Sequence, residues 1–236
     1  MTALKVSLLM GITICFSFAT INYSIAQTSI EVSGEIVTDT TWSADIVKVT
    51  GDITVINDKT LTIEPGTIIE FQGYYEFIIL GSVLAVGKPN DTMHFTINDT
   101  TGFYTNLDDF IGCWKGIYFS GKDASKFYCC KFSYAKNLGE QTSSWGGALE
   151  IRVANPMVWA CHFEHNYTKY YGAAICARVS DGLLIDSCLF NNNIAMNEGG
   201  ESISNQGMLS SGTTSFIITA PCMEGPWVSA INPMSG

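Results

Sequence analysis

The chain has 236 residues, of which 47% are hydrophobic, and its 12 basic and 22 acidic side chains give a formal net charge of −10. This charge repels a phosphate backbone, and Arg152 and Arg178 are the only arginines, so we expect no binding to nucleic acid. The length is sufficient for one domain with a buried core.

Residues 1–26 are predicted to be a secretory signal peptide. Lys5 precedes a nearly uncharged run from Val6 to Ala19, and Ser24-Ile25-Ala26 places small residues where a signal peptidase cleaves. The alternative is a retained membrane anchor, because the apolar run is long enough in principle. A polar chain follows Ala26 directly, which favours cleavage. The mature protein is then secreted or held on the outer cell surface, without a membrane span.

Residues 27–97 are predicted to form an N-terminal cap and the entry coils of a repetitive β structure. Short β-branched runs alternate with turn-forming residues, and no window shows helical periodicity. The stretch Ile30–Ser43 is expected to cap the open strand edges. Gly66–Ile69 and Gly81–Leu84 echo each other at a spacing of 15, which indicates short entry coils. The expected strands are Ile46–Val49, Ile53–Val55, Leu61–Ile63, Thr67–Phe71, Phe77–Leu80, Val83–Val86 and Met93–Thr96.

Residues 98–204 are predicted to be repeat coils, interrupted by an inserted loop at Thr100–Asp109. The spacing is 26 from Gly146 to Gly172, and 27 from Cys161 to Cys188, from Phe163 to Phe190 and from Asn166 to Asn193. A period of this length indicates a solenoid, in which each unit buries its apolar face only when its neighbours stack on it. The final segment, 205–236, loses the pattern after an extra residue near Glu201. It is either an irregular cap or the end of a truncated or frame-shifted longer array.

One coil is expected to contain a strand at Ala148–Ile151 and a strand at Met157–Phe163, after which Ala173–Ala177 stacks on the first. Phe132, Phe163 and Phe190 would then form an aromatic column in the core. Asn166 and Asn193 would form an amide ladder at a turn. Gly146, Gly147 and Gly172 suit corners that need a positive φ or a close approach.

Seven cysteines remain after Cys15 is removed with the signal, an odd number for an exported protein. Cys130, Cys161 and Cys188 each precede a phenylalanine by two positions, so they are expected to lie inward in successive coils. A buried column of thiols is the prediction. The alternative, a disulfide within the column, needs a favourable χ3 angle as well as proximity.

Several stretches resemble secreted bacterial right-handed parallel β-helix proteins of the pectin-lyase-like fold. They are Thr40–Ser43, Thr60–Thr67, Phe71–Tyr75, Gly81–Gly87, Phe95–Thr96, Trp114–Phe119 and Phe127–Cys130. Gly-Gly-Ala-Leu at 146–149 and Phe-x-x-Asn at 163–166 and 190–193 are similar to the polymorphic outer-membrane-protein repeat. The resemblance implies an all-β, single-domain, right-handed parallel β-helix with a structural, adhesive or glycan-binding role.

Enzymes of this fold that cleave acidic polysaccharides need carboxylates for Ca²⁺ beside a basic residue. Arg152 and Arg178, 26 positions apart, are expected to be stacked neighbours on the outside. With Glu150 and Asp186 as ligands, either arginine could serve as the base of a polysaccharide lyase. The favoured interpretation is two solvated arginines with ordinary ion-pair partners, so no catalytic residue is assigned. Asp181 and Asp186 bracket one strand, and Asp108-Asp109 lies in the inserted loop.

The three histidines, His94, His162 and His165, match no zinc pattern and are interpreted as solvated outer or turn residues, so neither a metal nor a cofactor is expected. Aromatic residues near turns could stack on sugar rings or contact a surface protein. These are Tyr74-Tyr75, Tyr104, Trp145, Trp159, Tyr167 and Tyr170-Tyr171. The sequons at Asn90, Asn98 and Asn166 indicate surface turns. The chain is expected to be a monomer or to associate end to end.

Overall fold

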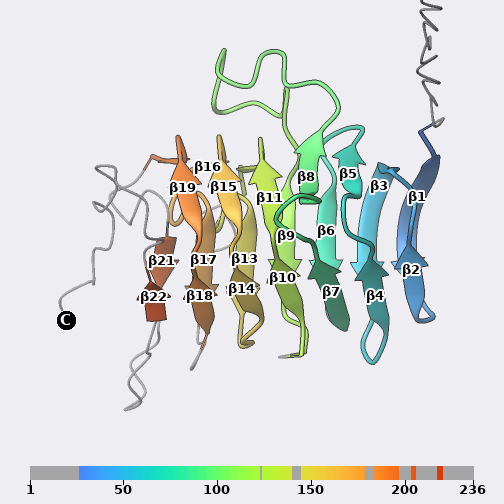
Figure 1. Ribbon diagram of the computed structural model, residues 1–236. Coiled ribbons are helices and arrows are strands. Elements are labelled where there is room, and N and C mark those ends of the chain that lie inside the picture. Colours follow the sequence, from blue (N-terminus) through green and yellow to red (C-terminus); the bar gives the residue numbers. More distant parts are fainter. Residues whose placement is uncertain are drawn as a thin grey trace, which may run out of the picture.

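The computed structural model describes residues 27–122, 124–139, 145–178, 183–196, 203–205 and 217–219 (Figure 1). Within these ranges the protein consists of strands and turns and has no helix, so it is all-β as predicted. No helix in this part of the chain is long and apolar enough to cross a membrane.

Parallel pairing joins the strands into three sheets. The largest has twelve strands and turns a corner at β3 (Ile46–Val55): Ile46–Val49 pair with β5, whereas Ile53–Val55 pair with β6. The first row, on the β5 side, contains β5 (Ile68–Phe71), β8 (Met93–Ile97), β11 (Cys130–Ser133), β15 (His162–Glu164) and β19 (Leu189–Asn191). The second row contains β6 (Glu76–Ile79), β9 (Gly116–Phe119), β13 (Leu149–Arg152), β17 (Ile175–Arg178) and β21 (Ile203–Asn205).

Two smaller sheets complete the fold. The seven-stranded sheet is β2 (Thr40–Trp42), β4 (Thr60–Ile63), β7 (Ser82–Val86), β10 (Lys126–Tyr128), β14 (Met157–Trp159), β18 (Leu184–Asp186) and β22 (Ile217–Thr219). The three-stranded sheet is β12 (Lys136–Asn137), β16 (Tyr167–Thr168) and β20 (Ile194–Ala195). The chain therefore visits the first row, the second row and the seven-stranded sheet in turn. The largest sheet is curled like half a barrel, which is compatible with a solenoid-like fold.

The core follows from the alternation of side chains along each strand. In β5, β6 and β4 every second residue is fully buried, because a strand points successive side chains to opposite faces. The predicted aromatic column is confirmed: Phe132 stacks on Phe163 at 4.8 Å between ring centroids, and Phe163 on Phe190 at 5.3 Å. It also continues to Phe95, which stacks on Phe132 at 4.8 Å.

The predicted column of cysteines is also confirmed. Cys130, Cys161 and Cys188 are buried and carry free thiols. Each thiol donates to a backbone carbonyl, as in the contact of 3.3 Å from Cys161 Sγ to the oxygen of Phe127. Burial raises the pKa of the Cys161 thiol, so this sulfur remains a protonated, unreactive packing atom.

The asparagine ladder forms at the corner after the phenylalanine column. Asn166 Nδ2 donates to Asn193 Oδ1 at 2.9 Å, and Asn166 Oδ1 accepts from the backbone N–H of Ala135 at 3.1 Å. Asn166 is completely buried, so its sequon is not the surface turn that was expected. The left-handed residue is the one before each asparagine: His165 has φ 55° and Asn192 has φ 52°.

Glycine corners are confirmed at two of the predicted positions by positive φ, 69° at Gly146 and 62° at Gly172. At Gly147 the reason is close approach instead. A Cβ on Gly147 would lie 2.1 Å from the carbonyl oxygen of Ala173. These corners hold β13 and β17 one on the other, as predicted for Ala173–Ala177.

One expectation about the coils was wrong. The stretch Met157–Phe163 is two strands in different sheets, β14 and β15, because the chain turns at Ala160, whose φ is 52°. The short entry coils are confirmed, although 15 is not itself the coil repeat: Leu61 pairs with Val83, 22 positions later, whereas Phe163 pairs with Phe190, 27 positions later. The stretch expected to be the cap contains two regular strands: β1 (Ser29–Ile36) pairs with β3, and β2 pairs with β4.

Candidate functional site

The two arginines of the chain meet on the outer side of the second row. Arg152 ends β13, Arg178 ends β17, and the two residues are register partners in the parallel pair. Neighbouring parallel strands lie about 4.8 Å apart, so the side chains leave the sheet side by side. The predicted stacking of these arginines is thereby confirmed.

Aromatic rings and one carboxylate surround the arginine pair. The Arg178 guanidinium lies over the ring of Trp145, 3.5 Å from its centroid, and the Arg152 guanidinium lies 5.4 Å from the centroid of Tyr118. Glu150 Oε1 accepts a hydrogen bond from Arg152 Nε at 2.6 Å. Its side chain is only 5% exposed, whereas that of Arg152 is 28% exposed. We call Tyr118, Trp145, Glu150, Arg152 and Arg178 the arginine site.

Burial and neighbouring charges both shift pKa values in the arginine site. Burial raises the pKa of the Glu150 carboxyl, and the hydrogen bond and charge of Arg152 oppose this rise. Burial lowers the pKa of the Arg178 guanidinium, and the like charge of Arg152 acts in the same direction. Guanidinium groups in proteins keep their charge at neutral pH. One carboxylate therefore faces two cations.

The expected lyase ligand set is divided between two sheets. Glu150 lies on β13, next to the arginines, but Asp186 ends β18 in the seven-stranded sheet. Asp186 Oδ1 accepts a hydrogen bond from Ser187. Asp181 lies outside the described residues. In the part of the chain that the structure describes, no group of three His, Cys, Asp or Glu side chains is arranged to hold a metal ion.

A second polar cluster lies on the outer side of the first row and contains all three histidines. His94 is the register partner of Lys131, and Lys131 is the partner of His162. His165 follows β15 directly at the corner. The chain positions of these residues are far apart, so parallel stacking brings them together. We call His94, Lys131, His162, Glu164 and His165 the histidine face.

The polar groups of the histidine face are paired with one another and with their neighbours. Lys131 Nζ lies 2.5 Å from Glu164 Oε1, and His162 Nε2 lies 3.4 Å from Glu164 Oε2. His94 Nε2 is hydrogen-bonded to the hydroxyl of Ser133 at 2.7 Å. Ser133 has no exposed surface, so it is a structural partner of His94 and cannot act as a nucleophile towards an external substrate.

The inserted loop, residues 98–115, folds against this end of the first row; Figure 1 shows it as the green loop that follows β8. The buried ammonium group of Lys136 is hydrogen-bonded to the loop. Its Nζ donates to the carbonyl oxygens of Asn106, Asp109 and Ile111 at 3.1, 3.3 and 3.4 Å. The same ammonium lies 4.7 Å from the centroid of the Phe103 ring. The sequence did not indicate that Lys136 would be buried.

The aromatic residues proposed to contact a ligand have different environments. Tyr104 is 51% exposed and Trp159 is 41% exposed, as expected of binding residues. Tyr167 is completely buried beneath the inserted loop with Phe103 and Cys113, so its assignment to the surface was wrong. Tyr104 approaches the histidine face, where its hydroxyl is hydrogen-bonded to His165 Nδ1.

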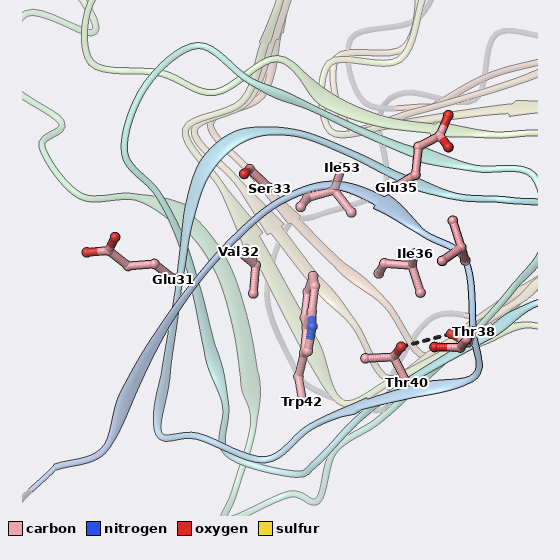
Figure 2. A pocket seen from close by; sticks show the side chains of 10 residues that line it. Glu31, Val32, Ser33, Glu35, Ile36, Thr38, Thr40, Trp42 and Ile53 are labelled. Carbon is pink, nitrogen blue, oxygen red and sulfur yellow. Dashed lines mark hydrogen bonds between the residues drawn. The ribbon is translucent and has the colours of Figure 1, made fainter.

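A shallow hollow of about 440 Å³ lies at the N-terminal end of the fold, between β1 and β2. Figure 2 shows the Trp42 ring between Val32 and Ile36, while Glu31 and Glu35 point away from it. The walls come from β1, β2, the loop between them and Ile53 of β3, and Trp42 itself is only 3% exposed. This hollow is the open end of the core.

No protein-family model, curated protein or solved structure matches this chain. The site must therefore be interpreted from its own chemistry. Two clusters remain as candidates, the arginine site on the second row and the histidine face on the first.

Proposed function

We propose that this protein is an exported right-handed parallel β-helix module that binds acidic glycans through the arginine site. The repeated passage from the first row to the second row and then to the seven-stranded sheet supports the β-helix assignment. Its right hand is the one that crossover connections between parallel strands almost always adopt. The signal peptide expected in residues 1–26 supports export.

The register partnership of Arg152 and Arg178 carries the proposal. A chain with 22 acidic side chains repels anions in general, yet its only two arginines lie side by side on one strand face. Guanidinium groups bind carboxylates through two parallel hydrogen bonds, which makes arginine the preferred partner of such groups. Two of them at the strand spacing can contact carboxylates on a single extended polymer.

The neighbouring rings suit a carbohydrate better than a free anion. Tyr118 and Trp145 belong to the same cluster as the guanidinium groups. An aromatic ring has an apolar face and, in tyrosine or tryptophan, a polar edge, which matches the two sides of a sugar ring. The combination of paired arginines and aromatic rings favours a glycan that bears carboxylates, such as a uronic acid polymer.

Calorimetric titration with oligogalacturonate and with its methyl-esterified form tests the proposal, since esterification removes the charge of each carboxylate and keeps the sugar backbone. We expect binding of the acidic form alone. The variant Arg152→Gln/Arg178→Gln should weaken it at least tenfold, because each charge-assisted hydrogen bond contributes about 1.5–3 kcal/mol. Lys122→Gln is the matched control, because Lys122 is exposed and pairs with Asp58 elsewhere on the surface.

Equal binding of both ligands, or unchanged binding by the double variant with its circular dichroism preserved, would reject the proposal. The alternative function, a polysaccharide lyase or hydrolase, is measured in the same samples. Formation of unsaturated or shortened products in the presence of Ca²⁺, and its loss in the double variant, would assign catalysis to the arginine site instead.

A further inference from the structure

The histidine face gathers every histidine of the chain. The sequence contains three, and the structure places His94 on β8, His162 on β15 and His165 directly after β15, all on the outer side of the first row. Between them lies Lys131 on β11. The face is separate from the arginine site, which belongs to the second row.

At neutral pH the charges of this face cancel. Lys131 forms an ion pair with Glu164, and burial lowers the pKa of His94 and His162, so these two rings are neutral at this pH. His162 Nε2 lies 3.0 Å from Asn191 Nδ2; where that amide donates, the imidazole accepts, and its proton is on Nδ1. Glu164 Oε2 then faces a nitrogen without a hydrogen at 3.4 Å.

Protonation of His162 turns the contact between His162 Nε2 and Glu164 Oε2 from an unfavourable one into an attractive one. The new Nε2–H can donate to Glu164, and the carboxylate then faces two cations, His162 and Lys131. The other titratable groups around it are His94 on β8, His165 beside it and Tyr104 of the inserted loop; β19 contributes only Asn191 and Leu189. No second carboxylate is among these groups. Acid therefore gives the histidine face a net positive charge.

His94 and His162 differ in the pH at which each ring gains a proton. Burial lowers the pKa of His94 to about 4, and Lys131 acts in the same direction, so this ring stays neutral in mild acid. Burial also lowers the pKa of His162 below its ordinary value, and Glu164 partly opposes this. His162 therefore gains its proton before His94 does. No other side-chain type has an ordinary pKa between 5 and 7.

We infer that the histidine face is a second anion-binding surface, which takes a polyanionic polysaccharide in acidic solution and releases it at neutral pH. Lys131 supplies a permanent charge, which Glu164 neutralises until His162 shares that carboxylate. The rings of Tyr104 and Tyr134 flank His165, and Tyr134 stacks on it at 5.2 Å between centroids. They give the charged groups the aromatic surroundings that a sugar polymer contacts.

Binding to immobilised dextran sulfate at pH 7.0 and 5.5 tests this inference, because sulfate esters keep their charge over this range. We expect the affinity of the natural protein to rise up to about fivefold on acidification, since one added surface charge contributes up to about this factor. The variant His162→Gln/His165→Gln should show a change of less than about twofold. This variant retains all carboxylates, so any change in affinity that remains in it measures the contribution of carboxylate protonation.

Two further variants separate the inference from other effects. Arg152→Gln/Arg178→Gln should keep the acid-induced rise, even where it abolishes oligogalacturonate binding at neutral pH. His162→Gln alone leaves the contacts of His165 in place and should lose most of the rise, because His162 is the ring that contacts Glu164. A rise that persists in the double histidine variant, or affinity independent of pH in the natural protein, would overturn the inference.

Discussion

Arg152 and Arg178 are register partners on β13 and β17, and Glu150, whose carboxylate is buried, lies two residues before Arg152 on the same face of β13. Strand spacing keeps the guanidinium groups close although they repel each other. Glu150 Oε1 is hydrogen-bonded to Arg152 at 2.6 Å, whereas Arg178 lies on Trp145. The buried carboxylate therefore depends directly on its hydrogen bond with Arg152.

Removal of Arg152 leaves a carboxylate with a 5% exposed side chain without its hydrogen-bonded cation. We predict that Arg152→Ala lowers the free energy of unfolding by about 2 kcal/mol, somewhat less than the loss for a fully buried pair. Arg178→Ala should cost less than about 1 kcal/mol. Urea denaturation at pH 7 measures both. Adding Glu150→Gln to Arg152→Ala should restore part of the loss; a further loss would contradict the explanation.

His94 makes stability depend on pH. The unfolded chain binds a proton at His94 near pH 6.5, but the folded chain does so only near pH 4, because burial depresses the pKa of the ring. The stabilising effect is therefore present above pH 6.5 and is lost as the pH falls through this window. For a partly exposed ring we expect a loss on the order of 2 kcal/mol between pH 7 and pH 4.5.

The variant His94→Gln tests this dependence, since glutamine can still hydrogen-bond to Ser133 but does not titrate. Its free energy of unfolding should change less between pH 7 and pH 4.5 than that of the natural protein. His162→Gln serves as the comparison from the same face. Equal acid sensitivity in the natural protein and in His94→Gln would show that other groups are responsible.

Spacing in the sequence was sufficient to predict the regular part of the fold. Cys130, Cys161 and Cys188 recur with a phenylalanine two positions later, and stacked parallel strands make such recurrence a column. The arginine pair followed from the same principle. The split of Met157–Phe163 was missed because the turn at Ala160 uses a residue with no turn preference. Only the sheets on either side require that left-handed conformation.

His162, His165 and Glu164 are close enough in the sequence to share a surface, but the addition of His94 and Lys131 was not predicted, because an insertion hides the period. His94 and Lys131 are register partners but lie 37 positions apart, since residues 98–115 form an extra loop in that turn of the chain. Tyr167 was expected on the surface, and the burial of Lys136 was not predicted. The inserted loop covers both residues, and no local sequence pattern shows which residues a loop covers.

Lys136 should control the order of the inserted loop. Its ammonium group satisfies three loop carbonyls in a completely buried position, and methionine has a similar length without the donors. We predict that Lys136→Met lowers the free energy of unfolding by about 2–3 kcal/mol, because buried carbonyls lose a charged partner. Amide hydrogen exchange should accelerate in residues 98–115 and remain unchanged in β4 to β7. Lys122→Met is the control, and unchanged exchange in the loop would contradict this role.

Asn166 is predicted to be the most costly single amide to remove. Its side chain donates to Phe132 and Asn193 and accepts from Ala135, all within the core. Replacement by alanine leaves these buried groups unsatisfied and should cost at least about 3 kcal/mol. Asn98→Ala, at an exposed position with one hydrogen bond to Gln72, should cost less than about 0.5 kcal/mol in the same thermal or urea measurements. A small loss for Asn166→Ala would mean that water replaces the ladder.

The open edge at β1 is predicted to be kept apart from other molecules by charge. β1 pairs with β3 on one side only among the described strands, and most of its residues are exposed. Glu31 and Glu35 lie on this strand, and its register shifts between Val32 and Gly34. Charged residues and bulges hinder pairing between edge strands of separate molecules.

We therefore expect Glu31→Thr/Glu35→Thr to associate end to end. Analytical ultracentrifugation should show a concentration-dependent dimer of this variant, while the natural protein remains monomeric under the same conditions. Lys48→Thr, on the neighbouring strand, changes charge without altering the edge and should stay monomeric; a double variant that also stays monomeric would show that the geometry of the bulge alone protects this end.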